Sequence, residues 1–250
     1  MRQDKDSCLI EPRRGRKEDP LPHSAILVFN PEDLRTFQDC FTHPVSKSHK
    51  IALADVFTGE FNGSPIALAG PMLGAPQTIL VLERIIALGA RQVIASGWCG
   101  SLQTHVGIGD IVLPVAAISE EGTSRHYPED TAAPSLHLMQ TLRQALGPSD
   151  RPIHEGTVWT TDAPFRETVT KVERYQSEGV LAVEMETSAL FTVARFRGID
   201  LAVVLVVSDD LSNFKWRHGF REPVFRESRR KVARLTLDAS SSAAASLSHS

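Results

Sequence analysis

Residues 65–101, PIALAGPMLGAPQTILVLERIIALGARQVIASGWCGS, contain the pattern that decides the fold. The strand-like run Pro65–Ala69 is followed by a helical segment with Pro76 near its first turn and Gly89 just past its end, an asymmetry typical of helices. This helix has little polar face, which predicts that it is buried. A second apolar run, Gln92–Ala95, comes next. The order strand, helix, strand favours a βαβ unit.

A second unit of the same kind lies near the C-terminus. Leu181–Val183 enters a helix expected over Glu184–Arg197, and Leu201–Val207 is a continuous apolar run, as in a strand buried on both faces. The alternation predicts an α/β fold with a largely parallel or mixed sheet. Further strands and a last helix are expected at Ala25–Phe29, Ile51–Phe57, Ile111–Ile118, Ile153–Trp159 and Arg221–Leu237.

Composition narrows the class of protein. The chain has 250 residues, of which 42% are hydrophobic and 23% charged, ordinary values for a soluble domain. Lys and Arg total 27 against 30 Asp and Glu, which argues against a broad nucleic-acid-binding face. No segment approaches the roughly 18 apolar residues of a membrane span, and no signal peptide is visible. We therefore expect a cytoplasmic protein that contacts neither nucleic acid nor membrane.

Both ends of the chain have the composition of tails. Residues 1–22 are polar and charged, and residues 239–250 (ASSSAAASLSHS) are of low complexity, so both are predicted to be disordered, with one domain over 23–238. The cysteines and histidines show no ligand spacing, so no metal and no other cofactor is expected. Arg229–Lys231 is expected on the solvated face of the last helix.

Gly97-Trp-Cys-Gly100 directly follows a predicted strand. Glycines allow a tight turn whose N–H groups point at an anion, as in phosphate-binding loops. The alternative is a plain strand-to-loop turn, which is the commoner use of such a segment. Neither a Walker nor a dinucleotide-binding motif occurs at this position.

Val183-Glu-Met-Glu186 lies where a strand meets a helix. Carboxylates at a helix N-terminus gain from the dipole and the free N–H groups, so an ordinary acidic first turn is one interpretation. The methionine between them favours a second one, a sugar site. A carboxylate accepts hydrogen bonds from hydroxyls while a thioether packs on a ring face.

Ser208-Asp209-Asp210 ends the most apolar strand. Partial burial raises the pKa of a carboxyl group at such an exit and suits it to act as an acid. A helix N-cap is the alternative. Because ligands of open α/β sheets bind beyond the carboxyl ends of strands, the three motifs together indicate an α/β enzyme with a small polar ligand.

Six motifs in order carry a resemblance to a known family: GPMLGAP, GWCGSLQTHVGIGDIV, EGTSRHY, TTDAPF, AVEMETSALF and VVSDDL. From about Ala25 to Leu237 the chain resembles the nucleoside phosphorylase and nucleosidase superfamily. Its members include purine nucleoside phosphorylases, uridine phosphorylases and methylthioadenosine/S-adenosylhomocysteine nucleosidases. The resemblance implies a single-domain three-layer α/β/α phosphorylase-like fold with a mixed central β-sheet. It also implies a homo-oligomer, either a dimer or a trimer of dimers.

The resemblance assigns roles to the site residues. Glu186 looks like the carboxylate that binds the ribose hydroxyls, with Met185 under the sugar and Glu184 beside it. Asp209 looks like the acid that protonates a purine at N7, with Arg221 as its supporting arginine. Three positions match the base pocket of the family: Thr161, Phe165 and Val183. Arg166 is a further candidate for contacting the base, and the start of a surface helix is the alternative.

The phosphate site departs from the family pattern. Phosphorolytic relatives have an arginine where this chain has Ala95 and a serine or threonine where it has Trp98. Nucleosidases lack these arginines and use a glutamate of the first loop to activate water. The candidates for contacting phosphate or water are Arg35, Gly97, Trp98, Glu32 and Asp33.

The function that the resemblance implies is cleavage of the N-glycosidic bond of a ribonucleoside, with purines favoured. Phosphorolysis would give free base and ribose 1-phosphate, with inorganic phosphate as co-substrate, in nucleoside metabolism and purine salvage. Two alternatives remain open. One is a hydrolytic nucleosidase that uses activated water. The other is a catalytically inactive nucleoside-binding module in which Trp98 fills the anion site.

Overall fold

A computed structural model describes residues 8–129, 133–147 and 149–247, without the side chains of 245–247. It confirms the expected mixed α/β fold of one domain. The strands are β1 Ser24–Val28, β2 Ser46–Ile51, β3 Ala54–Phe61, β4 Ser64–Gly70, β5 Gln92–Ser101, β6 Ile111–Glu120, β7 Ile153–Thr161, β8 Ala182–Glu184, β9 Asp200–Asp210 and β10 Arg217–His218. The helices are α1 Pro31–Cys40, α2 Gly74–Leu88, α3 Leu136–Leu146, α4 Val169–Ser177, α5 Thr187–Arg197 and α6 Pro223–Leu247.

The strands form one mixed sheet in the order β10-β9-β6-β7-β8-β5-β1-β4-β3-β2. In addition, β9 pairs in parallel with β5 along most of its length. As a result β5, β8, β7, β6 and β9 pair with one another in a closed ring. Strands β1 to β4 extend from this ring as an open sheet, and β10 pairs with β9 at the other side.

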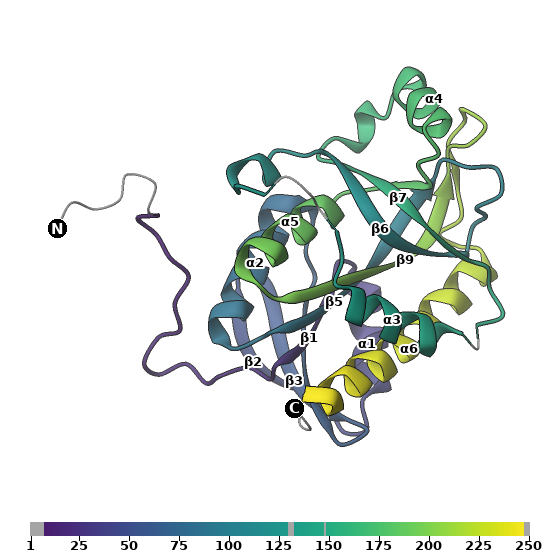
Figure 1. Ribbon diagram of the computed structural model, residues 1–250. Coiled ribbons are helices and arrows are strands. Elements are labelled where there is room, and N and C mark those ends of the chain that lie inside the picture. The colour runs from purple at the N-terminus through teal and green to yellow at the C-terminus, as the bar shows by residue number, and fades with distance from the viewer. Residues whose placement is uncertain (1–7, 130–132, 148, 248–250) are drawn as a thin grey trace.

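Helices cover both sides of the sheet (Figure 1). The helices α2 and α5 pack together on one side, and α1, α3 and α6 lie on the other. As the sequence predicts, α2 is largely buried, with Val81, Leu82 and Ile85 inaccessible to solvent. Likewise β9 is buried from Leu201 to Ser208, because it lies between β5 and β6 inside the ring.

Two predicted strands have different limits in the structure. The strand expected over Ile51–Phe57 is wrong, because the chain turns at Ala52 and Leu53 with φ values of 46° and 74°. These left-handed residues divide the segment into the hairpin strands β2 and β3. The strand expected over Gln92–Ala95 continues to Ser101 as β5, since it gains partners from β8 and β9 beyond Ala95.

The predicted C-terminal tail is wrong over 239–247, where α6 continues. Alanine is the best helix former, and the small side chains of Ala239 and Ala243 are buried. Ser241 adds a hydrogen bond from its hydroxyl to that of Ser64 at the start of β4. Low complexity here therefore reflects close packing of a helix, while residues 248–250 lie outside the described part of the chain.

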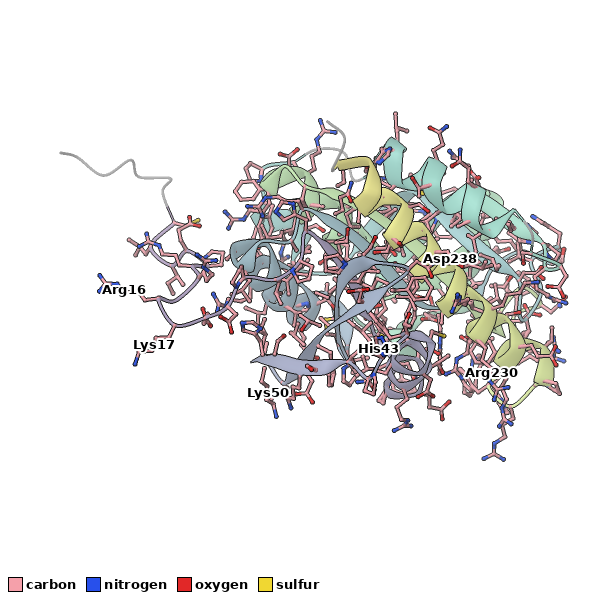
Figure 2. All side chains as sticks on the ribbon, turned by 90° about the horizontal axis from the view of Figure 1, so that it is seen from below. Arg16, Lys17, His43, Lys50, Arg230 and Asp238 are labelled. Carbon is pink, nitrogen blue, oxygen red and sulfur yellow. The ribbon has the colours of Figure 1, made fainter. Side chains whose placement is uncertain are left out.

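The N-terminal segment is described from residue 8 and contains neither helix nor strand up to β1. It runs away from the body of the molecule, and Arg16 and Lys17 point outward from it (Figure 2). Its last residues nevertheless attach to α2, through a 2.7 Å ion pair of Glu18 with Arg84 and the buried Leu21. Within the described ranges, every helix is too short or too polar to cross a membrane.

Removal of residues 239–250 tests the packing of the last helix. We expect the truncation to lower the free energy of unfolding by about 1–3 kcal/mol, because it exposes apolar surface under the removed turns. Urea denaturation measures the change, and removal of 248–250 alone is the control. Equal stability of the full chain and the longer truncation would contradict the packing of this helix end.

Candidate active site

Gly100 of β5 brings two of the predicted motifs together. It pairs with Val183 of β8 on one side and with Asp209 of β9 on the other. A Cβ atom on Gly100 would lie 3.0 Å from Asp209 Oδ2 and 3.4 Å from Val183 Cγ1. The predicted acid and the segment Val183–Glu186 therefore lie at the same end of the strand ring, and only a glycine leaves room between them.

Glu184 is fully buried and serves the helix that follows it. Its carboxylate accepts hydrogen bonds from the N–H groups of Glu186 and Thr187, both at 2.7 Å, and from the hydroxyl of Thr160. Burial raises its pKa. These bonds satisfy the free N–H groups at the start of α5. The structure thus gives Glu184 the role of a cap rather than the sugar contact that the resemblance implies.

Glu186 is also buried, at 7% exposure, yet it is less fully bonded. Its Oε1 accepts a hydrogen bond of 2.6 Å from the N–H of Gly74 at the start of α2. Burial and the charge of Glu184 raise its pKa to about 8. In the part of the chain that the structure describes, no cation pairs with Glu186. A ligand that donates hydrogen bonds from hydroxyl groups would compensate this carboxylate.

Met185 lies beside Glu186 and is half-buried. Its Cε is 4.0 Å from the position that a Cβ of Gly74 would occupy. The thioether and the carboxylate therefore both lie against the first turn of α2. This is the combination that the sequence predicts for a sugar, a hydrogen-bond acceptor next to an apolar surface.

Asp209 is half-buried and is held by two donors. Its Oδ1 accepts from the Ser208 hydroxyl at 2.6 Å, and its Oδ2 accepts from the Trp216 indole N–H at 2.9 Å. The prediction that Arg221 supports Asp209 is wrong in this structure, because Arg221 is exposed and has no hydrogen bond to it. The reason is β10, which pairs His218 with Asp209 and so carries Trp216 over the carboxylate.

Trp98, Asp33 and Arg229 form a buried cluster near the start of α1. The Trp98 indole N–H donates to Asp33 Oδ2, and Arg229 Nε donates to Asp33 Oδ1 at 2.6 Å. The Arg229 guanidinium also lies 4.7 Å from the centre of the Trp98 ring, a cation–π distance. Burial raises the pKa of Asp33 although Arg229 opposes this.

The sequence interpretation missed Arg229, which is 8% exposed rather than solvated. A signal was present, because Arg229 follows Phe225 by four residues and shares its face of the helix. Phe225 is fully buried and lies 5.3 Å from the Arg229 guanidinium. An apolar residue one turn earlier therefore marked this face of α6 as the inner one.

The other phosphate or water candidates are spread out. Glu32 is on the surface and forms a 3.1 Å ion pair with Arg229, while Arg35 is exposed on α1 without a bond to this cluster. Gly97 lies inside β5, and a Cβ there would come within 2.6 Å of the Phe29 ring. The segment Gly97–Gly100 is therefore part of a strand rather than a loop, and packing against Phe29 explains Gly97, while its contact with phosphate stays a prediction.

The predicted base contacts divide into two groups. Thr161, at the end of β7, and Val183 are both buried, and Val183 pairs with Gly100. Phe165 is completely exposed and Arg166 is exposed as well, on a single 3-10 turn over Pro164–Arg166. Within this chain these two side chains are thus not enclosed with the others.

Glu167 directly follows that turn and was missed by the sequence interpretation. It is half-buried, and burial together with the charge of Asp209 raises its pKa to about 7. No spacing in TTDAPFRE singles it out, because its proximity to Asp209 joins segments about 40 residues apart.

In the described ranges, no group of three His, Cys, Asp or Glu side chains is placed to hold a metal ion.

Comparison with known proteins finds relatives along most of the chain. The family model described as "Phosphorylase superfamily" matches residues 24–241. The chain is 30% identical over 209 residues to a purine nucleoside phosphorylase of DeoD type from Bacillus cytotoxicus, covering 82% of this chain and 87% of the relative.

Two solved structures share the fold. A uridine phosphorylase from Vibrio fischeri has a TM-score of 0.78 at 24% identity, covering 89% of this chain and 92% of that one. A purine nucleoside phosphorylase from Toxoplasma gondii in complex with immucillin-H has a TM-score of 0.82 at 23% identity, covering 96% and 98%.

The raised pKa of Glu186 predicts a pH-dependent cost in stability. Between its ordinary value of 4.5 and about 8, the folded state holds more protons than the unfolded state, so stability falls as pH rises. At pH 8 we expect Glu186→Gln to be more stable than wild type by about 1–3 kcal/mol, and the difference to shrink towards pH 5. Urea denaturation at both pH values measures it.

The exposed Glu60 of β3 provides the matched control, Glu60→Gln, which changes the same charge. We expect no pH-dependent difference from wild type for this variant. A Glu186→Gln protein that loses stability at pH 8 would show that the carboxylate is better compensated than its contacts indicate.

Proposed function

Because the chain belongs to the phosphorylase superfamily, we propose that it cleaves the N-glycosidic bond of a purine ribonucleoside by phosphorolysis, giving free base and ribose 1-phosphate. The observation that carries the proposal is the pairing of Gly100 with both β8 and β9. It places the Glu186 segment and Asp209 at one end of the strand ring. The purine nucleoside phosphorylases of Bacillus cytotoxicus and Toxoplasma gondii support the substrate class.

The chemistry requires stabilisation of two opposite charges. Breaking the bond between C1′ and the base builds positive charge on the ribose ring and leaves an electron pair on the base. Glu186 would accept a hydrogen bond from a ribose hydroxyl and so stabilise the sugar. Asp209 would donate a proton to N7, which makes the base a better leaving group.

The donors around Asp209 suit this role by fixing its orientation. Ser208 and Trp216 bind different oxygens of the carboxyl group. An acid held in this way meets the base in one geometry, and positioning of this kind contributes strongly to rate. Trp216 itself is 64% exposed, so its ring is also available to line the site.

Phosphate would require a cation, and Arg229 is the buried guanidinium beside Trp98. Both Asp33 and Glu32 already bind it, so phosphate would have to compete with them. This observation favours hydrolysis as the second candidate function. A buried carboxyl with a raised pKa, as in Asp33, is a group that can take a proton from water once one of its present bonds opens.

A product assay on a panel of purine and pyrimidine nucleosides tests the proposal. We expect free base and ribose 1-phosphate from inosine or adenosine only when inorganic phosphate is present. Free base and ribose without phosphate would establish hydrolysis instead. Nucleoside binding in calorimetry without any product would overturn both and favour a binding module.

Asp209→Asn tests the acid. We expect kcat/KM for purine nucleosides to fall by about a hundredfold to a thousandfold, because an amide cannot protonate N7. Asp210→Asn is the matched control, since its amide oxygen can still accept the N–H of Ser212 as the carboxylate does at 2.8 Å. Equal losses in the two variants would argue for a structural effect of this strand end.

Trp216→Phe and Arg221→Ala separate the two possible supports of Asp209. Loss of the indole N–H should lower kcat/KM about tenfold, the value of one hydrogen bond to a charged group. Arg221→Ala should stay within about twofold of wild type, because the exposed side chain makes no bond to the acid. Steady-state kinetics measure both, and the reverse ranking would restore Arg221 as the partner.

A further inference from the structure

A cavity of about 300 Å³ lies between α1 and α6, which pack against each other. Its lining includes neither Glu186 nor Asp209, so it is not the place proposed for the nucleoside. Figure 2 shows one of its residues, Arg230, at the surface of α6. A volume of this size is sufficient for a small ligand. Two side chains of α1 and three of α6 line the cavity: Glu32, Thr36, Arg226, Arg229 and Arg230.

Arg226 and Arg230 are exposed on the cavity side of α6 and are four residues apart. In the described ranges, no carboxylate or other acceptor binds either guanidinium group. Two like charges at this spacing destabilise a helix. By contrast, the next arginine along this row, Arg234, has Asp238 as a partner at 3.8 Å. An anion that binds both Arg226 and Arg230 would offset the repulsion between them.

The third guanidinium group, that of Arg229, forms the buried side of the cavity. Its Nε and Nη2 bind Asp33, both at 2.6 Å, and its Nη1 binds Glu32 at 3.1 Å. Asp33 therefore balances the charge of Arg229. The free positive charge of the cavity belongs to the two exposed arginines, and a phosphate group would bind there first.

Hydrogen-bond acceptors line the same cavity. The Glu32 side chain is 65% exposed, and its Oε2 accepts from Arg229, while its Oε1 has no donor in the part of the chain that the structure describes. The Thr36 hydroxyl donates to the carbonyl of Glu32 at 3.0 Å, and its oxygen can still accept. The Glu32 carboxylate would repel a ligand made only of anionic groups. A ligand that carries both a phosphate and hydroxyl groups satisfies the arginines and the acceptors together.

We propose that this cavity binds a small phosphorylated sugar. The phosphate accepts charge-assisted hydrogen bonds from Arg226 and Arg230, because a planar guanidinium group matches two phosphate oxygens. The sugar hydroxyls donate to Glu32 and Thr36. The five lining side chains include no aromatic ring and no aliphatic side chain, which disfavours a nucleobase or a lipid tail as the ligand.

Calorimetric titration tests the proposal with ribose 5-phosphate as the probe, next to inorganic phosphate and ribose. We expect wild type to bind ribose 5-phosphate about tenfold more tightly than phosphate, and ribose without measurable affinity. Arg226→Gln and Arg230→Gln should each weaken the binding of ribose 5-phosphate about tenfold, because each removes charge-assisted hydrogen bonds. The control Arg234→Gln removes the same charge from the same helix outside the lining and should keep the wild-type affinity.

Glu32→Ala tests the sugar part of the assignment. It removes an acceptor for hydroxyl groups and also a charge that repels phosphate. We therefore expect the affinity for ribose 5-phosphate relative to that for inorganic phosphate to fall about tenfold, which is the value of one hydrogen bond to a charged group. An unchanged ratio would show a site for a bare anion and would overturn the assignment to a sugar.

Two further results would overturn the proposal. One is the absence of ribose 5-phosphate binding to wild type. The other is binding that Arg226→Gln and Arg230→Gln leave unchanged, which would place the ligand elsewhere in the protein. Because the titration needs no turnover, its result is independent of the product assay. A protein that cleaves no nucleoside but loses ribose 5-phosphate binding in both arginine variants would contradict the proposed function and support this site.

Discussion

The pairing of β5 with strands on both sides at Gly100 is the constraint on which the site depends. The last residues of β5, Gly100 and Ser101, remain in strand conformation because they pair with β8 on one side and with β9 on the other. This closure brings together chain segments that are far apart in the sequence. A side chain at Gly100 would meet Leu211 at 2.8 Å and Asp209 at 3.0 Å, so the absence of a Cβ is what permits both contacts.

Several buried or half-buried carboxyl groups in the candidate site have no positively charged partner. Burial raises the pKa of Glu184, Glu186 and Glu167, which means that ionisation of these groups carries an electrostatic cost. For Glu184, hydrogen bonds from the N–H groups at the start of α5 offset part of this electrostatic cost. Glu186 and Glu167 keep unsatisfied acceptors instead. Buried carboxyl groups with raised pKa values are common at ligand-binding sites. Their cost in stability is tolerated because the hydrophobic core stabilises the rest of the fold.

The side chains of Trp98, Asp33 and Arg229 form a cluster in which each contacts the other two. A guanidinium, an indole N–H and a carboxylate satisfy one another in the interior. The carboxylate occupies donors that an incoming anion would otherwise use. Under the proposed function, the choice between phosphate and water would depend on how easily the pair of Asp33 and Arg229 opens, which is a property of the cluster rather than of any one residue.

The sequence by itself determined the α/β class, most of the strands, the helices α2, α5 and α6, and the positions of Glu186 and Asp209 at the ends of strands, because these depend on local periodicity and on motifs within a few residues. It did not determine the hairpin turn at Ala52 and Leu53 or the helical end of α6, where close packing overrides composition. Only the tertiary structure decided that Trp216 rather than Arg221 binds Asp209, that Arg229 is buried, and that Glu167 lies near the acid. Each of these depends on strand pairing or helix packing between segments that are far apart in the sequence. Local sequence patterns do not indicate that such segments are in contact.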